Sequence, residues 1–369
     1  MSKNGIPKLV SVDYVRFFLS ISIAIWHYQL IISVGNLYPA TFKDFPFSNE
    51  IGFFYTHGYL AVQFFWLVSG YIISYIYLEG NFKKRDYLRN RFARLYPLHI
   101  VTLLITGILQ VIASSRLGRQ PICGSNDLKH FLLNLFFIPS IGLEDGCSFN
   151  APIWSVSVEI YSYLLFMCLF VGIKKYGDIF CAVLIAIFSY IHHANIILIP
   201  KQVSACAIFF FTGVLVHALQ KTSRKAILFQ ISLSLTSIII CILIKAEILK
   251  ANKFTVSRLF DTEFSYLFIF APLLIIFLTV EEFFPKKYSS RFGMLGRFFG
   301  NLTYSCYLWQ FPLIIFFVII FGQNSNQLFI FARNPLFLLS YLIILLMISY
   351  LSFRFIENPT RKYFRTGSR

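Results

Sequence analysis

The stretch VDYVRFFLSISIAIWHYQLII (Val12–Ile32) decides how this chain folds. It is an apolar run of about 20 residues, the length that crosses a bilayer as an α-helix. Arg16 and His27 stand eleven positions apart in it, with no ionisable residue between them. On a helix that spacing returns to the same face within about 20° and separates the two residues by about 16 Å along the axis. Ionisable side chains inside a membrane usually face a protein interior or a watered cavity, so this pair indicates a functional path.

The composition is that of a membrane protein. Hydrophobic residues make up 57% of the chain and charged residues 13%, which is about half the charged share of a soluble domain. Apolar runs of about 20 residues predict an all-α fold, a polytopic helical membrane bundle formed by a single domain over residues 1–369. We expect about ten spans, with 131–142 as a re-entrant or interfacial piece. The expected spans are 12–33, 56–78, 98–114, 152–173, 178–196, 202–219, 226–246, 263–280, 299–321 and 336–356.

Positive charge predicts the orientation of these spans. With the N-terminus inside and the tail counted from Arg354, the inner segments hold 22 of the 33 Lys and Arg residues and the outer segments hold nine, while Arg16 and Lys245 lie within expected spans. Such a bias is typical of cytoplasmic loops, so both termini are expected to be cytoplasmic. The net charge of +17 is then explained by anchoring to the inner leaflet, without a nucleic-acid partner. The first apolar run lacks a cleavage pattern and is expected to remain as a helix.

The cysteines indicate packing and one candidate disulfide. Cys123 and Cys147 both fall in the large outer loop between the third and fourth spans. If that side is oxidising, a disulfide that closes the loop is plausible. The other cysteines fall in spans and are expected to pack there. No Cys or His cluster has the spacing of metal ligands, so no metal is expected.

The stretch NFKKRDYLRNRFARLYP (Asn81–Pro97), expected to be an inner loop, is strongly basic. Arg91 and Arg94 stand at i and i+3, so on a helix they point the same way, and arginine binds phosphate in a bidentate manner. Together with Arg89 they are candidate phosphate ligands. Anchoring of an inner loop explains the same charge without a ligand, above all for Lys83–Arg85.

The stretch APIWSVSVEIYSY (Ala151–Tyr163) opens the fourth span. Glu159 lies about 10 Å below the outer surface if the helix is entered from outside, and His27 lies about as deep. Two titratable groups at matched depth are what acid–base chemistry requires. The alternative is that Glu159 is a structural partner of a buried arginine, including Arg16.

Further polar and small residues are candidate contacts for a donor or a substrate. Ser155 shares a helix face with Glu159, and Trp154 is placed to gate the entrance. Ser69 and Gly70 are small enough for a ligand to approach closely, although packing against another helix explains them equally. In the stretch NLTYSCYLWQFPLI the candidates are Tyr304, Trp309 and Gln310.

Taken together, these motifs resemble those of the acyltransferase-3 superfamily of polytopic membrane acyltransferases, and the resemblance spans nearly the whole chain. Each motif alone is weak, but six occur in the expected order and on consistent sides of the membrane. They are the Arg16-to-His27 spacing, FFWLVSG (Phe64–Gly70), RFARLYP (Arg91–Pro97), WSVSVE (Trp154–Glu159), TYSCYLWQFP (Thr303–Pro312) and IENP (Ile356–Pro359).

The resemblance implies transfer of an acyl group, often acetyl, from cytoplasmic acyl-coenzyme A to a hydroxyl of an extracytoplasmic or lipid-linked glycan. His27 would be the catalytic histidine and act as a general base. Arg16 would hold the donor or position the histidine, and Arg91 and Arg94 would meet the coenzyme A phosphates. The implied location is a cell membrane, as in the bacterial inner membrane, with acyl-coenzyme A as a cosubstrate and no permanently bound cofactor.

The sequence also departs from the family pattern. Phe17 follows Arg16 where the family usually has glycine, and Gln310 stands where a histidine often follows the tryptophan. Glutamine at this position can still hydrogen-bond a substrate. Trp154 and Glu159 match the family's WS-x-x-x-E segment, which places Glu159 near the reaction centre.

Two other classes of protein fit parts of the pattern. A transporter or flippase of a glycan or a small anionic solute would also have many spans and a few buried titratable groups. It would more often show internal repeats or a polar lining spread over many helices. A structural protein would not need Arg16 or His27 in the membrane.

Overall fold

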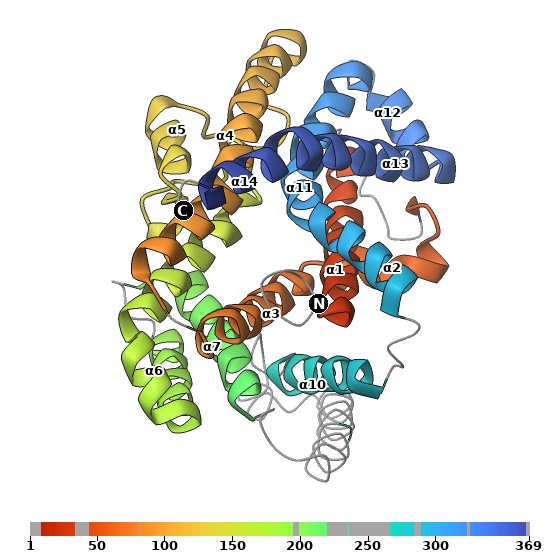
Figure 1. The fold of residues 1–369 in the computed structure, drawn as a ribbon. Coiled ribbons are helices and arrows are strands. Elements are labelled where there is room, and N and C mark those ends of the chain that lie inside the picture. The colour runs from red at the N-terminus through yellow and green to blue at the C-terminus, as the bar shows by residue number, and fades with distance from the viewer. Residues whose placement is uncertain are drawn as a thin grey trace, which may run out of the picture. The chain divides into compact units, whose positions relative to one another are not determined.

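The computed structural model describes residues 9–33, 44–80, 82–194, 199–219, 235, 266–283, 289–322 and 325–366. Every regular element in these ranges is helical (Figure 1). The long helices are α1 (Val10–Ser33), α3 (Leu60–Tyr77), α4 (Lys84–Leu117), α6 (Ile153–His193), α7 (Lys201–Leu219), α11 (Ser289–Phe321) and α13 (Pro335–Ser352). The shorter elements are α2 (Ser48–His57), α5 (Leu128–Leu135), η2 (Pro139–Ile141), α10 (Leu267–Phe283), α12 (Ser325–Ala332), η4 (Phe353–Glu357) and α14 (Asn358–Thr366).

Seven helices of the described residues are long and apolar enough to cross a membrane, the last of them running from α13 into α14. The all-α membrane class expected from the sequence is therefore confirmed. The predicted span 263–280 corresponds to α10, which has 17 residues and is short for a bilayer. The predicted span 226–246 lies outside the described residues apart from residue 235. The count of ten and the cytoplasmic placement of both termini stay predictions.

Two predicted spans, 152–173 and 178–196, lie in α6 and are separated by a sharp bend at Gly177. Its backbone angles are φ 54° and ψ −122°, and a positive φ is a conformation that glycine adopts without steric cost. The chain reverses enough for the Phe180 ring to reach Gly172, where an added Cβ would stand 2.8 Å from the ring. The two spans are thus separate helical segments joined at one residue.

The structure corrects two boundaries. The stretch Asn81–Pro97, expected to be a loop, is helical from Lys84 onward, and α4 continues through Pro97. Its Lys, Arg and Leu residues favour helix, and a helix can pass a proline when neighbouring elements hold it. The predicted span 56–78 is divided between α2 and α3, with the break at Gly58 and Tyr59.

The contacts group the described chain into two compact units, and α1, α3, α6 and α11 each contribute to both. Unit 1 comprises residues 1–16, 63–81 and 161–298. In it, Gly70 on α3 faces the backbone of Phe210 on α7, and Gly213 on α7 faces the backbone of Leu67. An added Cβ at either glycine would collide, so small residues allow the two helices to approach at backbone distance.

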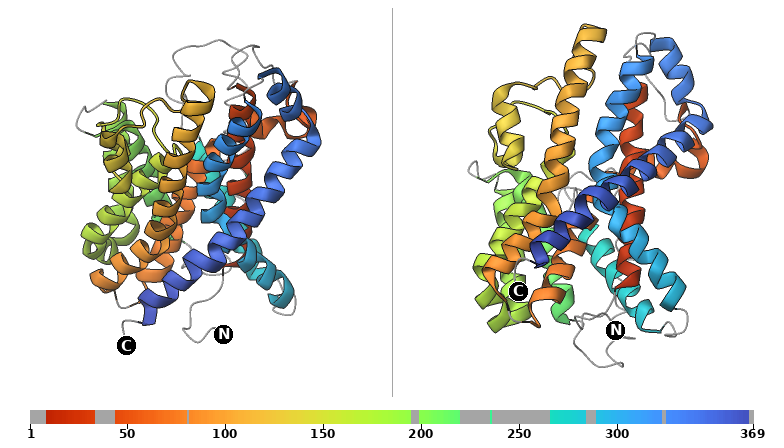
Figure 2. Two further views of the ribbon diagram at one scale, coloured as in Figure 1. Left: turned by 90° about the horizontal axis from the view of Figure 1, so that it is seen from above. Right: turned by 45° about the horizontal axis from the view of Figure 1, so that its top comes forward.

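Unit 2 comprises residues 17–62, 82–160 and 299–369. Its main apolar core joins α1, α11 and α13: the Tyr28 hydroxyl donates to the Ala332 carbonyl at 2.8 Å, and the Tyr28 and Tyr341 rings lie 5.4 Å apart. The C-terminal helix α14 packs along the first turns of α4 (Figures 1 and 2), where the Phe92 and Phe364 rings meet edge to face. In both figures α5 lies beside α4.

Gly58 is a point of close contact between α2 and α1 within unit 2. An added Cβ would stand 2.6 Å from the Ser22 carbonyl oxygen and 2.7 Å from Cβ of Trp26. We expect Gly58→Ala to lower the free energy of unfolding by about 1–3 kcal/mol, because overpacking forces neighbouring backbone to move. Gly52→Ala is the matched control, since Gly52 lies in α2 with open space around it. Thermal unfolding of the two variants measures the difference, and equal melting temperatures would contradict the contact.

Candidate active site

The centre of the candidate site is the contact between His27 on α1 and Gln310 on α11, both in unit 2. The carboxamide side chain of Gln310 reaches the imidazole of His27, and its Nε2 donates to the Tyr307 carbonyl at 2.9 Å. Gln310 is fully buried. Nδ1 of His27 is also buried, and it has no hydrogen-bond partner among the described residues. The ring also packs edge to face against Trp26, with the ring centroids 4.7 Å apart, and it keeps one nitrogen for another molecule.

Tyr307 connects this centre to the first turns of α6. Its hydroxyl lies 2.5 Å from the Ser155 hydroxyl and 2.9 Å from the Pro152 carbonyl, to which it donates. The Glu159 carboxylate, one turn after Ser155, lies close enough to interact electrostatically with the Tyr307 hydroxyl. Since Tyr307 and Gln310 are three residues apart on α11, one helix face joins Glu159 and Ser155 to the neighbourhood of His27.

Of the three other candidate substrate ligands, Tyr304 and Trp309 make hydrogen bonds within the protein, and Trp154 is partly exposed. The Tyr304 hydroxyl donates to the Leu95 carbonyl on α4 at 2.7 Å. Nε1 of Trp309 donates to the Ser352 hydroxyl at 2.6 Å. Trp154 is 36% exposed, a position compatible with gating. Binding of a substrate by these three residues stays a prediction.

The candidate donor residues lie in the basic first turns of α4. Arg89 forms an ion pair with Asp86 at 2.9 Å and keeps 22% of its side chain exposed, and Arg91 and Arg94 are half-buried. The helix α14, which packs against this segment, adds Arg361, whose guanidinium lies 3.5 Å from the buried Glu357 carboxylate. The segment is therefore a cationic end of unit 2, formed by two helices.

Three predicted residues belong to unit 1. Arg16 forms an ion pair with Asp13, one turn earlier on α1, at 3.6 Å. Gly70 is used for the close approach of α3 to α7, which supports the packing alternative for this motif. Donor contacts of Arg16, Ser69 and Gly70 stay predictions.

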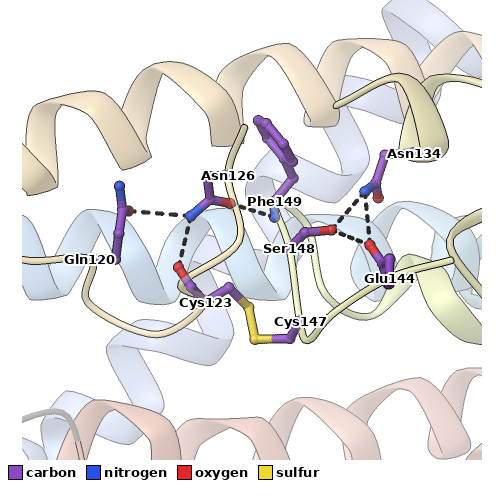
Figure 3. The surroundings of a disulfide bond; sticks show 8 residues. All are labelled: Gln120, Cys123, Asn126, Asn134, Glu144, Cys147, Ser148 and Phe149. Atoms are coloured by element: carbon purple, nitrogen blue, oxygen red, sulfur yellow. Dashed lines mark hydrogen bonds between the residues drawn. A yellow bond between two sulfur atoms is a disulfide. The ribbon is translucent and has the colours of Figure 1, made fainter. Parts of the chain in front are cut away.

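The loop between α4 and α6 is closed by the disulfide Cys123–Cys147, a pairing that the sequence left open (Figure 3). Asn126 lies beside it: its Nδ2 donates to the Cys123 carbonyl at 2.7 Å, and its Oδ1 accepts the Phe149 N–H at 2.7 Å. Phe149 is held at a φ of 42°, which is unusual for a residue with a side chain. The loop thereby determines the position of Asn150, next in the chain.

A second group of contacts fixes the part of the same loop that runs from Asn134 to Ser148. The Asn134 amide donates to the Ser148 hydroxyl at 2.8 Å, and Ser148 in turn donates to the Glu144 carboxylate (Figure 3). Nε2 of the buried His99 on α4 lies 2.8 Å from the Asn134 carbonyl. The predicted re-entrant segment 131–142 is thus a short helix and turn attached to the side of α4.

Sequence reasoning missed Tyr307, Asn150 and Gln110. Tyr307 lies in the quoted motif, three residues before Gln310, and this spacing was a usable signal. Nδ2 of Asn150 donates to the Leu308 carbonyl at 3.0 Å, which links the start of α6 to α11. Gln110 is a buried polar residue on α4, and only its position inside an apolar run marked it.

Comparisons with known proteins agree with the motif assignment. A family model described as "Acyltransferase domain", of the acyltransferase-3 family, matches residues 9–354. Acyltransferase MdmB from Streptomyces mycarofaciens is 34% identical over 113 residues, which cover 30% of this chain and 28% of that protein. The matched part thus spans less than a third of the length of this relative. No solved structure matches the chain at a significant level.

Proposed function

The chain belongs to the acyltransferase-3 family, and on this premise we propose that it transfers an acyl group, acetyl in the simplest case, from acyl-coenzyme A to a hydroxyl of a glycan or glycolipid on the outer side of a membrane. One observation carries the proposal: the imidazole of His27 contacts Gln310 and keeps a buried ring nitrogen without a partner among the described residues. A general base has to present such a nitrogen to the hydroxyl that it deprotonates.

In the proposed reaction His27 removes the proton of the acceptor hydroxyl while the oxygen attacks the thioester carbonyl carbon. The new carbon–oxygen bond forms and the carbon–sulfur bond breaks. The coenzyme A thiolate then receives from the imidazolium the proton that came from the acceptor hydroxyl. An imidazole, with an ordinary pKa of about 6.5, suits both halves of this transfer. Transient transfer of the acyl group to the imidazole is the two-step variant of the same chemistry.

Glu159 and Tyr307 are proposed to support the acceptor side. The carboxylate stands near the Tyr307 hydroxyl, which Ser155 holds at 2.5 Å. A carboxylate at this point can bind a sugar hydroxyl or favour the imidazolium that forms during transfer. Arg16 shares the helix face of His27 about 16 Å away along the axis, and we assign it to the donor on this spacing.

The donor is proposed to enter from the cationic end of unit 2. Arg91 and Arg94 would bind the phosphates of coenzyme A, as arginine pairs do. The bond from Tyr304 to Leu95 ties this end of α4 to α11, six residues or about 9 Å along the helix from Gln310. The acyl end of an extended donor could reach His27 along this face of α11.

The direct test is acyl transfer by the purified protein in lipid nanodiscs. With labelled acetyl-coenzyme A and a glycan acceptor, we expect the release of one free thiol for each acetyl group found on the acceptor. In a second assay the protein is placed in sealed vesicles. Movement of the acceptor across the vesicle membrane without thiol release would support a transporter or flippase and contradict the proposal. A single turnover without acceptor distinguishes the two routes, because only the two-step route leaves the label on the protein.

Arg94→Ala tests the donor end. We expect the KM for acetyl-coenzyme A to rise about tenfold with little change in kcat, because a charge-assisted hydrogen bond contributes about 1.5–3 kcal/mol. The control is Arg85→Ala, which removes an exposed arginine from the first turn of the same helix. An equal rise in both variants would mean that the segment acts through its overall charge, and no rise in either would exclude Arg94 as a donor ligand.

A further inference from the structure

The amides of Gln110 and Asn150 are two of four buried side-chain amides in unit 2 that leave polar atoms without hydrogen-bond partners among the described residues; the others are Asn134 and Gln310. Gln110 on α4 is 1% exposed and Asn150 is fully buried. Both Nε2 and Oε1 of Gln110, and Oδ1 of Asn150, have no hydrogen-bond partner among the described residues. Leaving such atoms unpaired in the interior is destabilising. Buried polar groups of this kind indicate a place where another molecule completes the hydrogen bonds.

The contacts around Gln110 place it beside the segment that carries Asn150. Gly107, one turn earlier on α4, faces the Phe149 ring, which an added Cβ would meet at 3.5 Å. Ala113, one turn later, belongs to a buried apolar cluster against which Ala151 packs. Because residues three apart share a helix face, Gln110 lies between two contacts that both involve segment 149–151.

The same neighbourhood includes the proposed reaction centre. Leu30, one turn after His27 on α1, packs against the same apolar cluster as Ala113, and the cluster includes Phe311, next to Gln310. Asn150 is joined to the Leu308 carbonyl, two residues before Gln310. Asn150 is therefore bound to the turn of α11 that carries Gln310, and Gln110 lies one turn from a cluster that also contacts the turns of α1 and α11 next to His27 and Gln310.

The chemistry of the two side chains favours one class of ligand. A carboxamide carries two N–H donors and a carbonyl acceptor, so it pairs with a hydroxyl as donor and as acceptor together. Adjacent hydroxyl groups on a sugar ring offer this combination. A phosphate or carboxylate needs donors only, and neither amide carries the positive charge that anions attract.

We propose that Gln110 and Asn150 form the subsite that binds the sugar hydroxyls next to the one that His27 deprotonates. This inference rests on the proposed function and specifies how the acceptor is recognised. The subsite favours a ring with neighbouring hydroxyls over an isolated alcohol, and it orients the reacting oxygen toward the unpaired nitrogen of His27.

The experiment compares two kinds of acceptor on one protein in nanodiscs with saturating acetyl-coenzyme A. The polyol probes are the methyl glycosides of glucose, galactose, mannose and rhamnose, of which the best substrate is carried forward, and the single-hydroxyl probe is 1-propanol. For Gln110→Leu we expect kcat/KM for the glycoside to fall about tenfold. For the same variant, kcat/KM for propanol and the KM for acetyl-coenzyme A should stay within about twofold of the wild-type values. Asn150→Ala should likewise lower kcat/KM for the glycoside but not for propanol. In the double variant, Gln110→Leu should lower the glycoside kcat/KM by less than a further tenfold.

The control is Gln63→Leu, which makes the same chemical change at another buried glutamine, on α3 in unit 1. An equal loss for glycoside and propanol in Gln110→Leu would show a structural role and overturn the subsite, and so would no loss for either. Donor hydrolysis without transfer to any glycoside would overturn the subsite and leave acyl transfer standing. A wild-type protein that neither transfers acetyl nor releases thiol would overturn the proposed function, and the subsite with it.

Discussion

His27→Ala is expected to abolish acyl transfer while leaving the fold intact. Removal of a general base typically lowers the rate by about 10²–10⁴-fold. The imidazole makes its contact with Gln310, but its Nδ1 has no partner among the described residues, so its loss leaves few structural bonds broken. We therefore expect kcat to fall by at least a hundredfold, with a melting temperature close to that of the wild type.

Two variants separate catalysis from structure in this test. His193→Ala removes an exposed histidine of α6 and should leave turnover unchanged. Gln310→Leu should lower kcat because it removes the side chain that positions the imidazole, and it should have no further effect once His27 is alanine. Full turnover by His27→Ala, or additive losses in the double variant, would contradict the assignment of the base.

The class of fold and the outline of the site could be predicted from the sequence because they depend on local patterns. Apolar length alone predicts membrane helices, and α1 runs unbroken through Arg16 and His27, as their spacing required. Motif order identified the family. In unit 2 the structure also brings Ser155 and Glu159 close to Tyr307, in the same motif as Gln310.

The remaining features depend on contacts between distant segments, which a single sequence does not encode visibly. The helical state of the basic stretch involves packing of α14 along α4, and the division of 56–78 involves the contact of Gly58 with α1. Gln110 gave only a weak signal, its place inside an apolar run, because an isolated glutamine belongs to no motif. Its significance comes only from burial without a partner.

The disulfide Cys123–Cys147 is joined by a short run of chain to the residues that we propose to serve the acceptor. Cys147 is followed within three residues by Asn150, whose amide is bound to the Leu308 carbonyl. Pro152, two residues further, accepts from the hydroxyls of Ser155 and Tyr307. We therefore expect a displacement of Cys147 to shift the residues around His27.

Cys123→Ser and Cys147→Ser should both destabilise the protein and impair transfer. The cysteines are 24 residues apart, and closing a loop of that size stabilises by about 3–4 kcal/mol in the chain-entropy estimate. We expect a lower melting temperature and at least a tenfold loss in kcat/KM for the glycan acceptor, because Phe149 no longer holds its unfavourable backbone conformation. The KM for acetyl-coenzyme A should stay near the wild-type value, since Arg91 and Arg94 lie at the other end of unit 2.

Reductant provides an independent route to the same state. Dithiothreitol should lower the acceptor kcat/KM of the wild type to that of the Cys123→Ser variant and should have no effect on the variant itself. Cys168→Ser, at an exposed free thiol, is the matched control and should keep the reductant sensitivity of the wild type. If reduction lowers the melting temperature but leaves the acceptor kinetics unchanged, the disulfide stabilises the loop alone, and segment 147–152 does not position the groups around His27.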